Sequence, residues 1–104
     1  MQDYIYEWDE NKNRININKH GVSFEEARTI FGDNNIIFET DDEHSFNELR
    51  EVAIGMSTQS NILYVCHCDR GKRDNKTVIR IFSARIADRF EIEMYIGGIY
   101  ETIY

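Results

Sequence analysis

The order of apolar patterns along the chain predicts an α+β fold, in which two N-terminal helices and one C-terminal helix pack on an antiparallel sheet of four to five strands. Helical spacing of apolar residues occurs near both ends, while alternating or continuous apolar runs fill the middle. Consecutive strands with short connections pair antiparallel, and helices then cover one face of the sheet. The length of 104 residues fits a single domain, 1–104, and a composition that is 41% hydrophobic can build a core.

The first two elements carry clear boundary signals. The aromatic and β-branched run YIYEW at 4–8 predicts a short strand. Asp9 is a good N-cap for a helix over about 10–20, and Gly21 suits the left-handed residue that ends it. Four asparagines give this helix a weak propensity, so we expect packing through Trp8 and Ile15 to hold it.

The remaining elements follow from capping and alternation. Ser23 and Glu26 form an S-x-x-E capping box that predicts a second helix over about 24–31. Strands are predicted over 35–40, 50–56, 62–68 and 77–82, with an acidic loop at 41–48 and a basic connection at 70–76. A third helix is expected from Ser83–Arg85 to about Tyr95, its apolar side formed by Ile86, Phe90 and Met94.

Charge is unevenly distributed along the chain. The net charge is −7 at pH 7, which by itself disfavours nucleic acid. Residues 1–49 hold four Lys and Arg against twelve Asp and Glu, whereas residues 70–89 hold seven against two. One cationic segment therefore lies within an acidic whole.

Several observations bear on compartment and cofactors. No apolar segment follows the N-terminus, so neither a signal peptide nor a membrane span is expected. Cys66 and Cys68 point the same way from one strand and are poorly placed to bond each other, which favours a reduced, cytoplasmic location. Alternation places His67 opposite both cysteines, so we expect neither a metal site nor another cofactor.

Four candidate site residues come from the strands and the expected third helix. Arg50 shares the apolar face of its strand, as either a snorkelling side chain or a cation aimed into a groove. His67 is either packed at a strand end or available for proton transfer. Arg80 lies opposite Ile79 and Ile81. Arg85 would occupy the first turn of the third helix, where an anion is favoured.

Two further groups of cations have both a structural and a functional interpretation. Lys19 and His20 lie at a helix C-terminus, where cations are favourable without any substrate, or they lie beside the sheet as proton-transfer groups. The hairpin cations are either solvated or track a phosphate backbone: Arg70, Lys72, Arg73 and Lys76.

An ordered set of short motifs runs through both halves of the chain. The first half is carried by YEWD at 6–9, Lys12, KHGVSFEEA at 19–27 and FGD at 31–33. The second half is carried by Arg50 with IGMS at 54–57, His67 with Arg70, and SARIA at 83–87 with Glu91 and Tyr95. Taken in this order, the motifs resemble the BrnT family, the toxins of a type II toxin–antitoxin system.

This resemblance implies a RelE-like fold and a ribonuclease that cleaves RNA without a metal and arrests translation. It implies neutralisation by a BrnA-like antitoxin, and DNA binding only through the complex with that antitoxin. Proton transfer at the 2'-hydroxyl and 5'-oxygen and stabilisation of the phosphorane would then fall to His67, Lys19, His20, Arg50, Arg80 and Arg85. Two alternatives stay open: an inactive module that binds an antitoxin-like partner in operon repression, and a bare RNA-binding domain.

Overall fold

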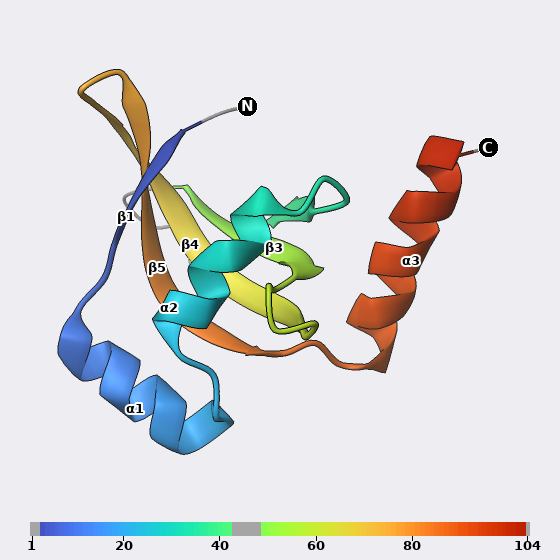
Figure 1. Cartoon of the computed structure of the whole chain (residues 1–104), viewed down its shortest axis with the longest axis horizontal. Coiled ribbons are helices and arrows are strands. Elements are labelled where there is room, and N and C mark those ends of the chain that lie inside the picture. Colours follow the sequence, from blue (N-terminus) through green and yellow to red (C-terminus); the bar gives the residue numbers. More distant parts are fainter. Residues whose placement is uncertain (1–2, 43–48, 104) are drawn as a thin grey trace.

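The computed structural model describes residues 3–42 and 49–103 and has the α+β architecture that the sequence predicts. The sheet has the order β1-β5-β4-β3-β2. Its strands are β1 (Tyr4–Glu7), β2 (Ile37–Thr40), β3 (Arg50–Met56), β4 (Ile62–Arg73) and β5 (Lys76–Ile86). The helices are α1 (Glu10–His20), α2 (Phe24–Ala27) with the following 3₁₀ turn η1 (Arg28–Gly32), and α3 (Arg89–Ile103) (Figure 1).

The sheet is mixed rather than wholly antiparallel. Strands β2 to β5 pair antiparallel in sequence order, as their short connections require. Strand β1 instead pairs parallel with β5, with Tyr4 opposite Thr77 and Glu7 opposite Arg80. The antiparallel prediction is wrong for β1 because no short connection joins β1 to β5, so nothing in the chain path forces the two strands to run in opposite directions.

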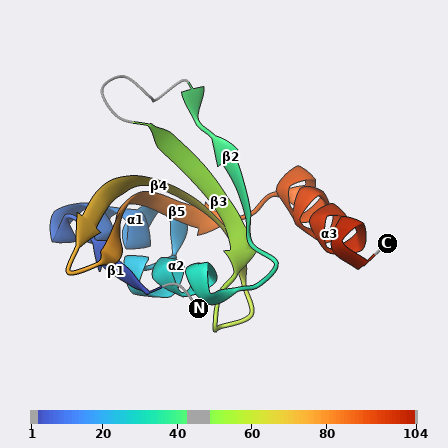
Figure 2. The same ribbon diagram turned by 90° about the horizontal axis from the view of Figure 1, so that it is seen from above.

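The helices lie on both faces of the sheet. Alternation along β3 sends Ala53 into the core under α2 and η1, and sends Val52 and Ile54 into the core under α3. The first core also takes Phe24 of α2, and the second takes Tyr95 of α3. The expectation that all helices share one face is therefore wrong for α3, which stands apart from α1 and α2 (Figure 2).

Helix α1 has the predicted bounds and caps, but its anchor is polar. The Asp9 side chain accepts from the backbone N–H groups of Asn11 and Lys12, and Gly21 has φ +71°. Ile15 is 57% exposed, so the expected packing through this residue is wrong. The buried residues of the helix are Asn13 and Asn16.

These two asparagines connect α1 to the rest of the fold. Asn13 accepts from the backbone N–H of Phe24 at 2.9 Å. Asn16 donates to the carbonyls of Val22 (2.8 Å) and Ala84 (2.7 Å) and accepts from the N–H of Ala84 (3.1 Å). Residues that lower helix propensity thus supply the hydrogen bonds that hold this helix.

The second helix is shorter than predicted, and its capping box is incomplete. Ser23 accepts from the N–H of Glu26 at 3.0 Å, as an N-cap should. The Glu26 carboxylate accepts instead from Ser57 (2.7 Å) and Asn61 (2.9 Å), at the turn between β3 and β4. The α-helix then tightens into η1 after Ala27.

The C-terminal part differs most from the prediction. The 70–76 segment belongs to a long β4–β5 hairpin that turns at Asp74 and Asn75, both with positive φ. Residues 83–86 continue β5, and α3 begins only at Arg89. The predicted apolar side is consequently wrong: Ile86, Phe90 and Met94 are 49%, 76% and 39% exposed. Of the expected acidic loop, residues 43–48 lie outside the described residues.

No helix within 3–42 and 49–103 combines the length and the apolar character needed to cross a bilayer.

Candidate functional site

An open groove of about 510 Å³ lies between α1, which forms one wall, and the three central strands. Three of the predicted site residues line it, namely His20 from α1, Arg50 from β3 and Arg85 from β5. The remaining lining residues are Lys12, Asp41, Tyr64, Cys66, Phe82, Ser83 and Ala84. Segments far apart in the sequence therefore bring two guanidinium groups, an ammonium and an imidazole to one surface.

Aromatic rings hold the cations of the groove in place. The guanidinium carbon of Arg50 lies 3.9 Å from the centroid of the Phe82 ring, and Lys12 Nζ lies 5.9 Å from the same centroid. The guanidinium carbon of Arg85 lies 4.0 Å from the Tyr64 ring centroid. Such cation–π contacts are worth about 0.5–2 kcal/mol each and fix the charges without neutralising them.

Arg85 also forms a bidentate ion pair with Glu91 of α3. The two nitrogen–oxygen distances are 2.7 and 2.8 Å, and this contact raises the pKa of Arg85 above its ordinary value. Glu91 also completes a capping box at the start of α3: its carboxylate accepts from the N–H of Asp88, the N-cap, while the Asp88 side chain accepts from the N–H of Glu91. Arg85 lies at the end of β5, so the prediction that it occupies the first turn of a helix is wrong.

The α1 wall comes from one stripe of the helix. Lys12, Asn16 and His20 recur at intervals of four and share a face. The central residue, Asn16, is hydrogen-bonded to Ala84 of β5, and Ala84 directly precedes Arg85. This anchor places Lys12 and His20 on either side of it along the groove.

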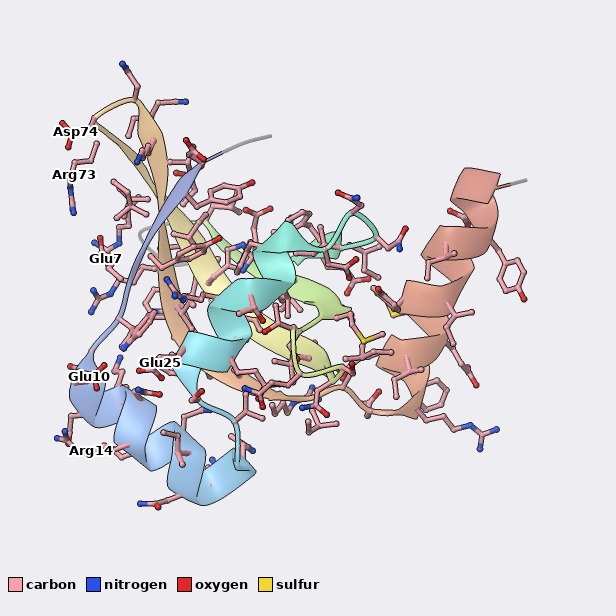
Figure 3. The ribbon with its side chains drawn as sticks, in the orientation of Figure 1. Glu7, Glu10, Arg14, Glu25, Arg73 and Asp74 are labelled. Atoms are coloured by element: carbon pink, nitrogen blue, oxygen red, sulfur yellow. The ribbon has the colours of Figure 1, made fainter. Side chains whose placement is uncertain are left out.

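Arg80 does not join Arg85. Its Nη1 lies 2.8 Å from Glu7 Oε2 on β1, and Arg73 reaches the other oxygen of Glu7 at 3.7 Å. Glu7 and Arg73 lie on the flank of the molecule formed by β1 and the hairpin (Figure 3). Four residues of strand lie between Arg80 and Arg85, so their backbones are about 16 Å apart.

His67 and Lys19 also lie outside the groove lining. The His67 side chain is on the other face of the sheet, 99% buried, with the Phe31 ring 5.1 Å away. Burial lowers the pKa of His67, so its imidazole is neutral at pH 7. Lys19 is exposed in the last turn of α1, next to His20.

The hairpin cations are exposed along its projecting arm: Arg70, Lys72, Arg73 and Lys76. They form a cationic extension beyond the groove, at the upper left of Figure 1.

Two residues of the groove were missed as site residues from the sequence, Lys12 and Asp41. The i, i+4, i+8 spacing with Asn16 and His20 could have identified Lys12. Asp41 carried no such signal, because its place depends on the pairing of β2 with β3, where its N–H donates to the carbonyl of Arg50 at 2.8 Å.

The chemistry of the groove is that of fixed cations. Burial raises the pKa of Cys66, which disfavours a thiolate nucleophile there. Within the described part of the chain, no three His, Cys, Asp or Glu side chains group as metal ligands. Cations over rings, beside an imidazole and a carboxylate, can bind a phosphate and stabilise charge that develops on it.

Comparison with known proteins gives the family. No curated protein sequence matches the chain. The crystal structure of the ribonuclease toxin BrnT from Brucella abortus superposes with a TM-score of 0.53 at 22% identity and covers 85% of this chain and 100% of that one, a likeness of fold. The family model described as "Ribonuclease toxin, BrnT, of type II toxin-antitoxin system" matches residues 8–91. The chain therefore belongs to the BrnT family of ribonuclease toxins of type II toxin–antitoxin systems.

Proposed function

We propose that the chain is an endoribonuclease that cleaves RNA in the open groove without a metal ion and thereby inhibits translation. The observation that carries this proposal is the convergence of Lys12, His20, Arg50 and Arg85 on one groove. RNA cleavage by the 2'-hydroxyl needs a proton acceptor, positive charge around the pentacovalent phosphorane and a proton donor to the 5'-oxygen. The side chains of the groove can meet all three needs.

The roles divide by chemistry. Arg50 and Arg85 supply fixed charge to the phosphorane, because the aromatic rings beneath them hold both guanidinium groups. His20 and Lys12 carry the proton transfers, and imidazole is the side chain best suited to this at neutral pH. The exposed hairpin cations Lys72 and Lys76 extend the contact to neighbouring phosphates.

The test is cleavage of a structured RNA by the purified chain in the presence of EDTA. Arg50→Ala and Arg85→Ala should each reduce the rate by about 10²-fold, which is typical of removing one group that stabilises an oxyanion. Arg89→Ala is the matched control, because its side chain is 90% exposed on α3 and does not line the groove. Cleavage that requires a divalent ion, or equal rates for all three variants, would contradict the proposal.

A second set of variants examines the residues outside the groove. Arg80→Ala and His67→Gln should leave RNA cleavage within a few-fold of the wild type once folding is verified, because neither residue lines the groove. A loss as large as that of Arg85→Ala would move the catalytic site toward Glu7 and β1 in the case of Arg80, and toward Glu51 and Phe31 in the case of His67.

The antitoxin partner follows from the family, and we propose that it is a BrnA-like protein that binds DNA on behalf of the complex. The acidic N-terminal half supports a basic contact region in this partner. Co-purification with the product of the adjacent gene tests the pairing, and relief of growth arrest by that product tests neutralisation. We also propose a cytoplasmic location, because an RNA substrate and the DNA bound by the complex are both available there.

One observation favours a second candidate, an inactive module that binds its partner without cleaving RNA. Both Arg80 and Arg85 are paired with carboxylates, those of Glu7 and Glu91. An arginine already in a bidentate pair must exchange a carboxylate for a phosphate before it can act. Undetectable cleavage together with tight partner binding would select this candidate.

A further inference from the structure

A second cavity, of about 230 Å³, lies on the face of the sheet opposite the RNA groove, beside Phe31 at the end of η1. Its walls combine aromatic rings with acidic groups: Tyr4, Phe31, Phe38, Glu51, His67 and Asp69. The groups proposed above for RNA cleavage line the other face and do not line this cavity.

The aromatic part of the cavity is well ordered by mutual contact. The Phe31 ring meets His67 edge to face, with centroids 5.1 Å apart, and lies 5.9 Å from Tyr4. The Phe38 ring lies 5.9 Å from His67 and is 48% exposed, so it borders the opening. Ring faces carry negative quadrupole charge and attract cations.

The polar part of the cavity is acidic. Glu51 Oε1 lies 4.0 Å from His67 Nε2, and the Glu51 side chain is 32% exposed. Asp69 lies on the same side, with one carboxylate oxygen accepting from the N–H of Gly71. Neither Lys nor Arg occurs among the described residues that line the cavity. His67 adds no positive charge at pH 7, because burial lowers its pKa.

We propose that this cavity binds an organic cation, an alkylammonium or guanidinium group, against the adjoining Phe31 and Phe38 rings, whose centroids lie 6.4 Å apart, and beside the Glu51 carboxylate. A phosphate would meet two carboxylates there, so RNA does not fit. A neutral apolar group would shield the Glu51 and Asp69 carboxylates from water without offering them a hydrogen bond or a positive charge, which costs free energy. An organic cation satisfies both the rings and the carboxylates.

The cation can be a free amine or a Lys or Arg side chain of a bound protein, which share this chemistry. A side chain from the proposed antitoxin would place the partner on the face opposite the groove. The antitoxin as the source of the cation rests on the proposed function, whereas the proposal that the cavity binds a cation does not.

The experiment is an NMR titration of the full chain with n-butylguanidinium, observed at the ring resonances of His67 and Phe38. The neutral isostere n-butylurea is the matched ligand control. We expect saturable shifts with the cation and none with the urea. Glu51→Gln should weaken binding roughly tenfold by removing the charge while keeping the shape. Glu39→Gln, an exposed substitution on β2 outside the lining, should bind as the wild type does.

Three outcomes would overturn the proposal: no saturable shift, equal response to the urea, or unchanged affinity in Glu51→Gln. RNA cleavage does not enter this assay, so an inactive chain that binds the cation separates the two proposals. Comparing spermidine with N-acetyl-arginine-N-methylamide identifies the source. Tighter binding of the first indicates a free amine, and tighter binding of the second a partner side chain.

Discussion

Asn16→Ala should destabilise the protein more than any other alanine substitution in α1. The side chain makes three hydrogen bonds, to the carbonyls of Val22 and Ala84 and to the N–H of Ala84, at 2.7–3.1 Å. Val22 and Ala84 are each 1% exposed, so their backbone groups would lose these partners inside the protein. A buried group without a partner costs about 1–3 kcal/mol. Three such groups at the lower end of this range cost about 3 kcal/mol, and the better helix propensity of alanine offsets about 0.5 kcal/mol, so we expect a net loss of about 2.5 kcal/mol.

The assay is urea unfolding followed by circular dichroism. At a slope of about 1.5 kcal/mol/M, typical of a chain of this size, the midpoint should fall by roughly 2 M. Asn18→Ala is the control, because Asn18 is exposed on the same helix and alanine should leave the midpoint equal or slightly higher. A midpoint change below about 0.5 M for Asn16→Ala would refute the polar anchor of α1 and leave the apolar contacts of Trp8 to explain its position.

Three further predictions concern the helix ends and the buried imidazole. Gly21→Ala should cost about 1 kcal/mol of unfolding free energy because φ is +71°, whereas Gly32→Ala, with equally open space and no positive φ, should be neutral. Glu91→Gln should cost about 1–2 kcal/mol in urea unfolding by weakening both the α3 cap and the pair with Arg85. The lowered pKa of His67 means that the unfolded chain takes up a proton near pH 6.5 while the folded chain does not. Stability should therefore be complete above that pH and fall as pH drops toward 5, and His67→Gln should flatten this slope.

The parts of the fold that sequence predicts well are those fixed by local chemistry. The Asp9 cap and Gly21 give α1 its bounds, and alternation gives β3 its bounds at Arg50 and Met56. None of these features depends on which neighbour a segment meets. The anchor of α1 does depend on its neighbours. Helix propensity alone therefore gave no sign that Asn13 and Asn16 hold the helix, although both are buried and hydrogen-bonded to other segments.

The error at the end of β5 shows how a ladder overrides propensity. Residues 83–86 include Ala84 and Arg85, which are good helix formers, and so favour an early start for the third helix. In the structure they pair with β4, Ser83 opposite Cys66 and Arg85 opposite Tyr64. A β-bulge between Cys66 and His67 interrupts the alternation, so the period of the strand is not visible in the sequence.

The sequence predicted only part of the groove, again because contacts between distant segments are not visible in it. Arg50 was identified because it shares the apolar face of its strand, and Arg85 because of a helix start that the structure does not have, yet both line the groove. Arg80 was identified on the face opposite Ile79 and Ile81, but it pairs with Glu7, and only the parallel pairing of β1 with β5 brings that carboxylate to it. A sequence without an alignment shows that a cation is unusual, but not which partner it meets.

The α1 wall links the stability of the fold to the chemistry of the groove. Lys12 contacts β5 through the Phe82 ring at 5.9 Å, and the bonds from Asn16 to Ala84 hold the stripe of Lys12 and His20 against the same strand. Loss of Asn16 should therefore loosen the wall even in molecules that stay folded. RNA affinity should be measured without urea, at a temperature where Asn16→Ala is still folded. Under these conditions the RNA affinity of Asn16→Ala should be several-fold weaker than that of the wild type, while the affinity of Asn18→Ala should be unchanged. Equal RNA affinity in the two folded variants would mean that α1 holds Lys12 and His20 in place without this anchor.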